Sequence, residues 1–387
     1  MKTIPYARQT VDEIDVQAVA DILRSDFLTQ GPIIERFEKA VAAYCGVKYA
    51  VAVNSATSAL HIACLAAGLG PGDVLCTSPN TFVASANCAR YCGADVDFVD
   101  IDERTYNMSA ERLADKLCKA AKKGKLPKVI IPVHFAGQSC RMDEIGTMAK
   151  QYGITVIEDA SHAIGGRYKG RPIGCCAYSD MVVFSFHPVK IITTGEGGMV
   201  LTNREDLYKK LLLYRSHGII RDPAQMENEP HGSWYYEQTA LGYNYRMTDI
   251  QAALGLSQLA KLDRFVACRI EIARKYDTEL ADLPLILPWQ DPDGQSAWHL
   301  YVVRVDVGKT EKTRREVFDS LRASGIGVNV HYIPVHTQPY YQRLGFKPGD
   351  FPIAEQYYQE AVSLPMYYSL TAEEQAYVID SLKQVLK

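Results

Sequence analysis

Lys190 lies between two apolar segments of this 387-residue chain, where an ammonium group is costly to bury. Residues 182–186 read VVFSF and residues 199–201 read MVL, and both runs predict buried strands. A buried amine must be paired, neutralised or used chemically. The turn TTGEGG that follows Lys190 lets the backbone pass close to a bound group. Lys190 is therefore a candidate for reaction with a carbonyl group.

Acidic residues end another apolar run, in the segment VIEDASHAIGG (156–166). Glu158 and Asp159 close the run, and His162 follows Asp159 by three residues. An acid directly after a buried strand either caps the next turn or binds a cationic group, and the residues alone leave both open. Ser185, five residues before Lys190, ends a strand in the same way.

A third candidate is the segment NSATSAL (54–60), in which small hydroxyl residues open a predicted helix directly after a strand. The free N–H groups of a helix start, with the hydroxyls of Thr57 and Ser58, would form a phosphate site. An ordinary helix N-cap is the alternative.

A lysine, a buried acid and a phosphate site on one sheet edge together indicate pyridoxal phosphate. That cofactor needs an amine for its Schiff base, an anchored phosphate, and a carboxylate that keeps the pyridine nitrogen protonated. Each signal is weak alone, but their order along one α/β domain is far more specific.

The elements that would position these groups alternate between strand and helix from residue 49 onward. The apolar runs are YAVAV, DVLCT, DVDFVDI, KVIIPVHF, ITVIEDA, DMVVFSF and GMVLT. Such alternation predicts an α/β domain with a mostly parallel, buried sheet. Reactive residues of these sheets gather at the carboxyl ends of the strands.

The pattern changes after residue 246. Residues 247–280 have one glycine and no proline and predict a long helix that bridges two domains. HLYVVRVD and IGVNVHYIPVH read as strands, with helices near 310–323 and 371–385. We therefore expect an N-terminal helix and arm (1–30), a large α/β domain (31–246), and a smaller α+β domain with the bridging helix (247–387).

Composition excludes several classes of protein. The net charge of −3 favours neither a nucleic acid nor an acidic membrane as partner. No apolar stretch approaches the roughly 18 residues of a membrane span, and the N-terminus has no signal-peptide pattern, so we expect a cytoplasmic protein. The ten cysteines form no C-x-x-C and are expected to be reduced core residues rather than metal ligands. GKT (308–310) lacks the upstream glycine of a phosphate loop.

With these motifs assembled, the chain resembles the sugar-nucleotide (DegT-type) aminotransferases over nearly its whole length. The matching stretches are LTQGP, NSATSALH, GDVLCTSPNTFVASAN, EDASHAIG, FSFHPVKIITTGEGG, RSHG, LGYNYRMTDIQAALGLSQL and GIGVNVHYIPVH. The resemblance implies the aspartate-aminotransferase-like fold (PLP fold type I).

The resemblance also implies roles for single residues. Lys190 would form the Schiff base with pyridoxal phosphate and later move the proton, Asp159 would hold the pyridine nitrogen, and His162 would orient the cofactor. The phosphate would be bound by Ala56, Thr57, Ser58 and Ser185. Phe82 would stack on the cofactor ring, although a lone aromatic is also a common core residue.

In relatives, the residue that matches Asn244 or Arg246 in GYNYR completes the phosphate site across a dimer interface. A homodimer with shared active sites is therefore implied. The alternative is that Asn244 caps the following helix within its own subunit.

The substrate side resembles the branch that acts in pseudaminic acid synthesis. Those enzymes transfer an amino group from glutamate to the 4-keto carbon of UDP-2-acetamido-2,6-dideoxy-β-L-arabino-hexos-4-ulose. The resemblance makes substrate contacts of Tyr6, Asp26, Phe27, Leu28, Thr29, Asn329, His331 and Tyr332. Leu28 and Tyr332 are equally consistent with packing, and His231 departs from the acidic or small residue expected there.

Other functions stay open at this stage. One is a related nucleotide-sugar 4-aminotransferase of the UDP-N-acetylbacillosamine or GDP-perosamine type. A second class on the same fold has histidine in place of the lysine and dehydrates sugars, and Lys190 argues against it. A regulator that keeps the fold without turnover is disfavoured because Lys190, Asp159 and Ser185 are all present.

Overall fold

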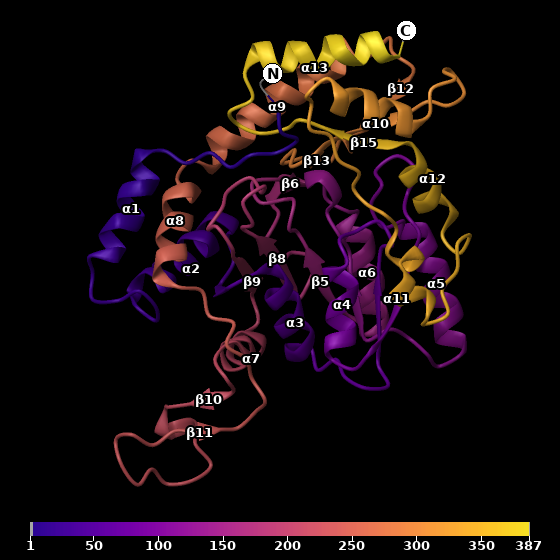
Figure 1. Ribbon diagram of the computed structural model, residues 1–387. Helices are drawn as coiled ribbons and strands as arrows, with labels where there is room; N and C mark the ends of the chain where they lie inside the picture. Colours follow the sequence, from indigo (N-terminus) through magenta and orange to yellow (C-terminus); the bar gives the residue numbers. More distant parts are fainter. Residues whose placement is uncertain (1–2, 387) are drawn as a thin grey trace.

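The computed structural model describes residues 3–386, and its larger part is built on a seven-stranded sheet (Figure 1). The strands run in the order β1-β9-β8-β5-β4-β2-β3, and β9 alone is antiparallel to its neighbours. They are β1 (Tyr49–Val53), β2 (Val74–Thr77), β3 (Asp95–Phe98), β4 (Val129–Ile131), β5 (Thr155–Asp159), β8 (Met181–Ser185) and β9 (Gly198–Thr202). The predicted mostly parallel sheet is confirmed, strand by strand.

Both faces of this sheet are covered because its strands are apolar on both sides. Val51 and Val53 pack in one core and Ala50 and Ala52 in another, as the two-residue period of a strand requires. The covering helices are α2 (Pro32–Cys45), α3 (Ala56–Ala66), α4 (Ala84–Tyr91), α5 (Ala110–Lys122), α6 (Met142–Tyr152) and α7 (Glu205–Arg215).

The C-terminal part packs two helices on a small antiparallel sheet of order β12-β14-β15. Its elements are β12 (Leu285–Ile286), β14 (Tyr301–Val305), α10 (Arg314–Ala323), α11 (Pro339–Gln342), α12 (Pro352–Glu360), β15 (Ala361–Leu364) and α13 (Ala372–Val385). The strand predicted over HLYVVRVD and the two predicted helices are confirmed.

The strand predicted over IGVNVHYIPVH is wrong. Within residues 326–336 only two isolated bridges form, from Ile326 to Ile4 and from Asn329 to Ser363. Pro334 has no N–H to donate to a ladder, and the place beside β14 is taken by β15. The segment crosses instead toward the larger sheet, where Val335 N–H donates to the Pro79 carbonyl over 2.9 Å.

The long helix predicted over residues 247–280 is two helices, α8 (Asp249–Leu259) and α9 (Leu262–Glu279). The break falls at Lys261, whose Nζ lies 2.8 Å from the buried Asp15 carboxylate of helix α1 (Glu13–Leu23). Only α9 contacts both cores: Phe265 packs with the large sheet, and Tyr276 packs with the small one.

A two-stranded ribbon between α7 and α8 projects away from the body at the bottom of Figure 1. It consists of β10 (Ile219–Ile220) and β11 (Glu237–Gln238), and the connecting segment exposes Trp234. The remaining short strands are β6 (Arg167–Tyr168), β7 (Arg171–Pro172) and β13 (Gly294–Gln295). No helix within residues 3–386 is long and apolar enough to cross a membrane.

Candidate active site

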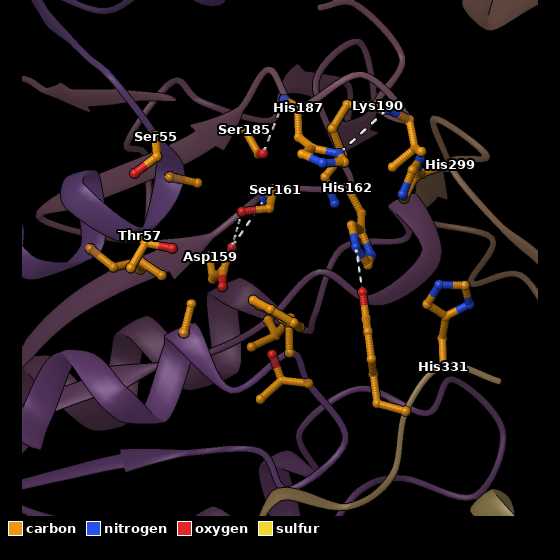
Figure 2. Close-up of a pocket in the computed structure, with 18 of the residues that line it drawn as sticks. Ser55, Thr57, Asp159, Ser161, His162, Ser185, His187, Lys190, His299 and His331 are labelled. Atoms are coloured by element: carbon orange, nitrogen blue, oxygen red, sulfur yellow. Dashed lines mark hydrogen bonds between the residues drawn. The ribbon is translucent and has the colours of Figure 1, made fainter. Parts of the chain in front are cut away.

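A cavity of about 420 Å³ lies at the carboxyl ends of β5 and β8, beside the starts of α3 and α4 (Figure 2). It brings together residues from both ends of the chain. The sequence-predicted residues that line it are Tyr6, Ala56, Thr57, Phe82, Asp159, His162, Ser185, Lys190, Asn329, His331 and Tyr332.

The start of α3 offers an anion site on one side of this cavity. Ser55 is the N-cap, and its hydroxyl accepts the Ser58 N–H over 3.1 Å. The N–H groups of Ala56 and Thr57, which come first in the helix, have no acceptor within it. Ser58 itself does not line the cavity, because its hydroxyl donates to Asn54 Oδ1 over 2.6 Å.

Gly198, the first residue of β9, explains how close the chain passes to this anion site. A Cβ at Gly198 would lie 2.5 Å from the Ser55 carbonyl carbon and 2.6 Å from the Ala56 nitrogen. Only glycine lets β9 begin here without pushing the helix start away from the cavity.

The Asp159 carboxylate is 5% exposed and is held by two serines. Ser85 Oγ donates to Oδ2 over 2.7 Å, while the Ser161 hydroxyl donates to Oδ1 over 2.6 Å. The Ser161 N–H donates to the same Oδ1 over 3.1 Å, so Asp159 also caps its own turn. The two roles left open by the sequence are compatible, since the carboxylate caps locally and still faces the cavity (Figure 2).

The Lys190 amine faces the same cavity and forms no hydrogen bond or ion pair with any residue between 3 and 386. Burial lowers the pKa of Lys190 to about 8, against the opposing effect of the Asp159 charge. A lysine of this kind holds a useful fraction of neutral, nucleophilic amine near neutral pH.

His162 is a neutral imidazole with a defined tautomer. Its Nδ1 accepts the Ala136 N–H over 3.3 Å, so Nε2 carries the proton and donates to the Tyr332 hydroxyl over 3.1 Å. Burial holds the pKa of His162 well below its usual value, and the nearby Lys190 charge acts in the same direction. The Tyr332 hydroxyl proton is thereby left free for another acceptor.

His331 is likewise neutral, because burial lowers its pKa to about 3 with a further contribution from Lys190. Its Nδ1 lies 2.7 Å from the Ser363 hydroxyl, and its Nε2 lies 3.4 Å from the Asn329 side-chain nitrogen. The Tyr6 ring packs on the His331 ring at 5.6 Å between centroids. The N-terminal arm therefore meets the C-terminal part of the chain at the cavity wall.

The alternative interpretation of Phe82 as a core residue is wrong, because its side chain is 58% exposed and lines the cavity. The interpretation of Asn244 as a helix cap is also wrong. The N-cap of α8 is Thr248, whose hydroxyl accepts the Gln251 N–H over 3.2 Å.

Besides Ser58, six predicted site residues lie outside the cavity of their own chain: Asp26, Phe27, Leu28, Thr29, Asn244 and Arg246. They form one neighbourhood, since the Leu28 carbonyl accepts the Asp249 N–H over 3.0 Å and Thr29 forms a bridge with Thr248. The arm and the segment before α8 therefore lie side by side.

Sequence reasoning missed several residues of the site: Ser85, Ser161, His187, Glu196 and His299. Ser161 stood two residues after Asp159 in a motif already singled out, and Ser85 stood in the segment PNTFVASAN. His299 had no such signal, because it precedes a strand of the smaller sheet, far along the chain from Lys190.

The cavity fits pyridoxal phosphate. It has a helix start with free N–H groups, a buried carboxylate, a poised amine and an exposed aromatic face at Phe82. Among residues 3–386 no group of His, Cys, Asp and Glu side chains is arranged to hold a metal ion. This fold and this site define an enzyme dependent on pyridoxal phosphate.

The chain matches the DegT/DnrJ/EryC1/StrS aminotransferase family over residues 9–383 and belongs to it. It is 43% identical over 387 residues to the spore coat polysaccharide biosynthesis protein SpsC of Bacillus subtilis (99% of this chain, 97% of that protein). It is 38% identical over 387 residues to the UDP-4-amino-4,6-dideoxy-N-acetyl-beta-L-altrosamine transaminase of Campylobacter jejuni (99% and 98%).

Solved structures agree with this assignment. Helicobacter pylori PseC, an aminotransferase involved in the biosynthesis of pseudoaminic acid, superposes with a TM-score of 0.90 at 31% identity (100% and 99% of the two chains). The PLP-form of the sugar aminotransferase Spr1654 from Streptococcus pneumoniae gives 0.88 at 30% identity (99% and 98%). The protein is a sugar aminotransferase with PLP fold type I, and pyridoxal phosphate is its cofactor.

When bound, this cofactor supplies a carbonyl for an amine and a ring that withdraws electrons. We assign the protein's contributions to its own residues. Lys190 would offer the amine and move the proton, and Asp159 would offer a fixed negative charge. The helix start at Ala56 and Thr57 offers N–H donors to a phosphate. The neutral His162 keeps a second positive charge away from Lys190.

Proposed function

We propose that the protein transfers an amino group from glutamate to C4 of UDP-2-acetamido-2,6-dideoxy-β-L-arabino-hexos-4-ulose, a step of pseudaminic acid biosynthesis. The observation that carries this proposal is the meeting of Tyr6, Asn329 and Tyr332 beside Lys190 in one cavity. The likeness to transaminases named for the 4-amino-L-altrosamine product supports the same sugar.

A second candidate is an aminotransferase for another nucleotide sugar, of the UDP-N-acetylbacillosamine or GDP-perosamine type. It is supported by the 39% identity over 358 residues to the GDP-perosamine synthase of Caulobacter vibrioides (92% of this chain, 91% of that protein). A change of sugar needs no change in Lys190 or Asp159, because those residues act at the cofactor.

The proposal includes a homodimer in which each active site is completed by the other subunit. The Arg246 side chain forms no hydrogen bond or ion pair within residues 3–386 and lies outside its own cavity. Asn244 is exposed, and the neighbouring ribbon exposes Trp234, Tyr236 and Leu241. A second copy of the chain is the partner that would bury these side chains and receive Asn244, Arg246 and the arm residues 26–29 at its cavity.

The experiment compares three keto sugars as substrates. Each is incubated with purified holoenzyme and glutamate, and the rate of 2-oxoglutarate release is measured. The sugars are the proposed UDP substrate, the D-xylo UDP isomer that leads to bacillosamine, and GDP-4-keto-6-deoxymannose. We expect the largest kcat/KM with the first. A larger kcat/KM with either of the others would replace the proposed substrate with that sugar.

A further inference from the structure

Four histidines line the cavity beside Lys190, and the ring of one of them, His299, has no hydrogen-bond partner among residues 3–386. His162 and His331 each have both ring nitrogens within hydrogen-bonding distance of a neighbour. His299 is 2% exposed and lines the cavity, yet its imidazole bonds to none of residues 3–386. Its Nδ1 is fully buried without a partner. A buried nitrogen in this state costs free energy and therefore calls for an explanation.

The surrounding structure holds His299 in place. The Arg269 guanidinium of α9 is fully buried and donates to the carbonyls of Trp298 over 3.1 Å and His299 over 3.3 Å. The His299 N–H donates to the Ala136 carbonyl over 2.9 Å. Trp298 adopts a φ of +50°, which is strained for a large side chain.

A glycine gives this segment the room it needs. Gly137, at φ +106°, would bring a Cβ to 2.8 Å from the Trp298 nitrogen and 3.1 Å from the His299 nitrogen. Close packing, a strained backbone and a buried guanidinium thus fix one residue whose imidazole has no hydrogen-bond partner among residues 3–386.

The position of His299 indicates what it would bind. Its ring centroid lies 4.4 Å from that of His162, and Figure 2 shows it beside Lys190. The α-carbon of any amino-acid donor carries both a carboxylate and the amine, and the amine would react at the cofactor carbonyl carbon that Lys190 holds. That carboxylate must therefore lie near Lys190, among the histidines.

The charges of the cavity also indicate which groups would bind this carboxylate. Lys190 is the only Lys or Arg among the residues that line it. In the proposed dimer, the Arg246 of a second copy would serve the phosphate. A carboxylate bound beside Lys190 would then take its other hydrogen bonds from neutral donors of this chain, and His299 has an N–H to give. Burial holds the pKa of His299 well below its usual value, so the ring is a neutral donor.

We infer that His299 binds the α-carboxylate of the amino donor. This inference rests on amino transfer, which family membership establishes, and on glutamate as donor, which belongs to the proposed function. It assigns to the donor half-reaction a residue that the keto-sugar half-reaction does not need.

The test uses His299→Phe, which keeps the packing on His162 and removes both nitrogens. We expect the KM for glutamate to rise by about tenfold to a hundredfold, the worth of one hydrogen bond to a charged group. The KM for the keto sugar should stay unchanged. His299→Asn or His299→Gln, whose amide nitrogens replace Nδ1 or Nε2, should restore part of the loss.

His336→Phe is the matched control. His336 is also fully buried with an unpaired Nδ1, but it lies outside the cavity and bonds to Glu355 over 2.9 Å. This variant should leave the KM for glutamate unchanged, since it removes a buried histidine without touching the donor site.

Two analogues of the amino donor distinguish the roles of the α-carboxylate and the γ-carboxylate of glutamate. 4-Aminobutyrate lacks the α-carboxylate of glutamate, and 2-aminobutyrate lacks the γ-carboxylate. Their inhibition constants should show that His299→Phe weakens the binding of 2-aminobutyrate and leaves the binding of 4-aminobutyrate unchanged. Weaker binding of 4-aminobutyrate alone would assign His299 to the γ-carboxylate and overturn the inference. Equally weaker binding of both analogues and of the keto sugar would also overturn it.

The controls also separate this inference from the proposed function. If the wild-type holoenzyme reacts with glutamate but with none of the keto sugars, the proposed substrate is contradicted and the His299 test still applies. If the wild-type enzyme reacts with glutamate and the KM for glutamate is unchanged in His299→Phe, only the inference on His299 is contradicted.

Discussion

Ser85 Oγ donates a hydrogen bond to Asp159 Oδ2 over 2.7 Å and thereby ties helix α4 to the end of strand β5. The Thr81 hydroxyl lies 2.8 Å from Ser85 Oγ and donates to it, because the single Ser85 proton is already given to Asp159. The Asp159 carboxylate, which we propose for the cofactor nitrogen, is thus held in one orientation by a chain of hydroxyls.

Replacing Asp159 with Asn should preserve the fold and slow the reaction with glutamate. A hydrogen bond to a charged group is worth about 1.5–3 kcal/mol, which corresponds to about tenfold to a hundredfold in rate. Ser85→Ala should cost less, about twofold to tenfold, because the Ser161 bonds to Asp159 remain. Stopped-flow absorbance of the donor half-reaction measures both.

Ser381→Ala is the control for these variants, since Ser381 is a buried serine of α13 outside the cavity. Unchanged rates in Asp159→Asn would contradict the role assigned to Asp159.

The pH dependence of cofactor uptake reports on Lys190. Its pKa of about 8 lies below the ordinary 10.5, so the neutral amine becomes the major form above about pH 8. Uptake of pyridoxal phosphate by cofactor-free protein should therefore speed up about tenfold per pH unit below pH 8 and level off above it. A rate that keeps rising to about pH 10.5 would show an ordinary, solvated lysine instead.

Shared active sites predict complementation between two inactive variants. Lys190→Ala lacks the amine, and Asn244→Ala lacks the group offered to the other subunit. A mixed dimer would have one site with both groups intact, so mixing should restore part of the activity. Absence of recovery, with subunit exchange demonstrated by mass spectrometry, would show that Asn244 acts within its own chain.

The sequence predicted the large sheet well because its strands are local apolar runs that need no knowledge of their neighbours. Asp159, Ser185 and Lys190 could be found for the same reason, since Asp159 and Ser185 end such runs and Lys190 follows one within five residues. His299 could not be found in this way. It reaches the cavity only because Trp298 turns through a left-handed conformation and Arg269 holds the turn from another helix.

The break between α8 and α9 also depends on contacts distant in sequence. No glycine or proline marks it, and the end of α8 is fixed where Lys261 meets Asp15, 246 positions earlier in the chain. The failed strand at residues 326–336 has a similar origin, because its place beside β14 is taken by β15, a segment the sequence pattern did not single out.

Lys261→Met should lower the melting temperature by several degrees, because it leaves the fully buried Asp15 carboxylate without its cation. The exposed Lys309, which pairs with Asp306, is the comparison, and Lys309→Met should have almost no effect. Differential scanning calorimetry distinguishes the two. Equal melting temperatures would mean that the ion pair does not hold α1 against the α8–α9 junction.

The most direct test of the proposed activity follows the nitrogen atom itself. Holoenzyme is incubated with glutamate labelled in its amino group and with UDP-2-acetamido-2,6-dideoxy-β-L-arabino-hexos-4-ulose, and the product is examined by NMR. We expect the label on C4 of an L-altro-configured UDP-sugar, and no labelled sugar with Lys190→Ala. Label that stays in glutamate, or labelled sugar at the wild-type rate from Lys190→Ala, would contradict the account.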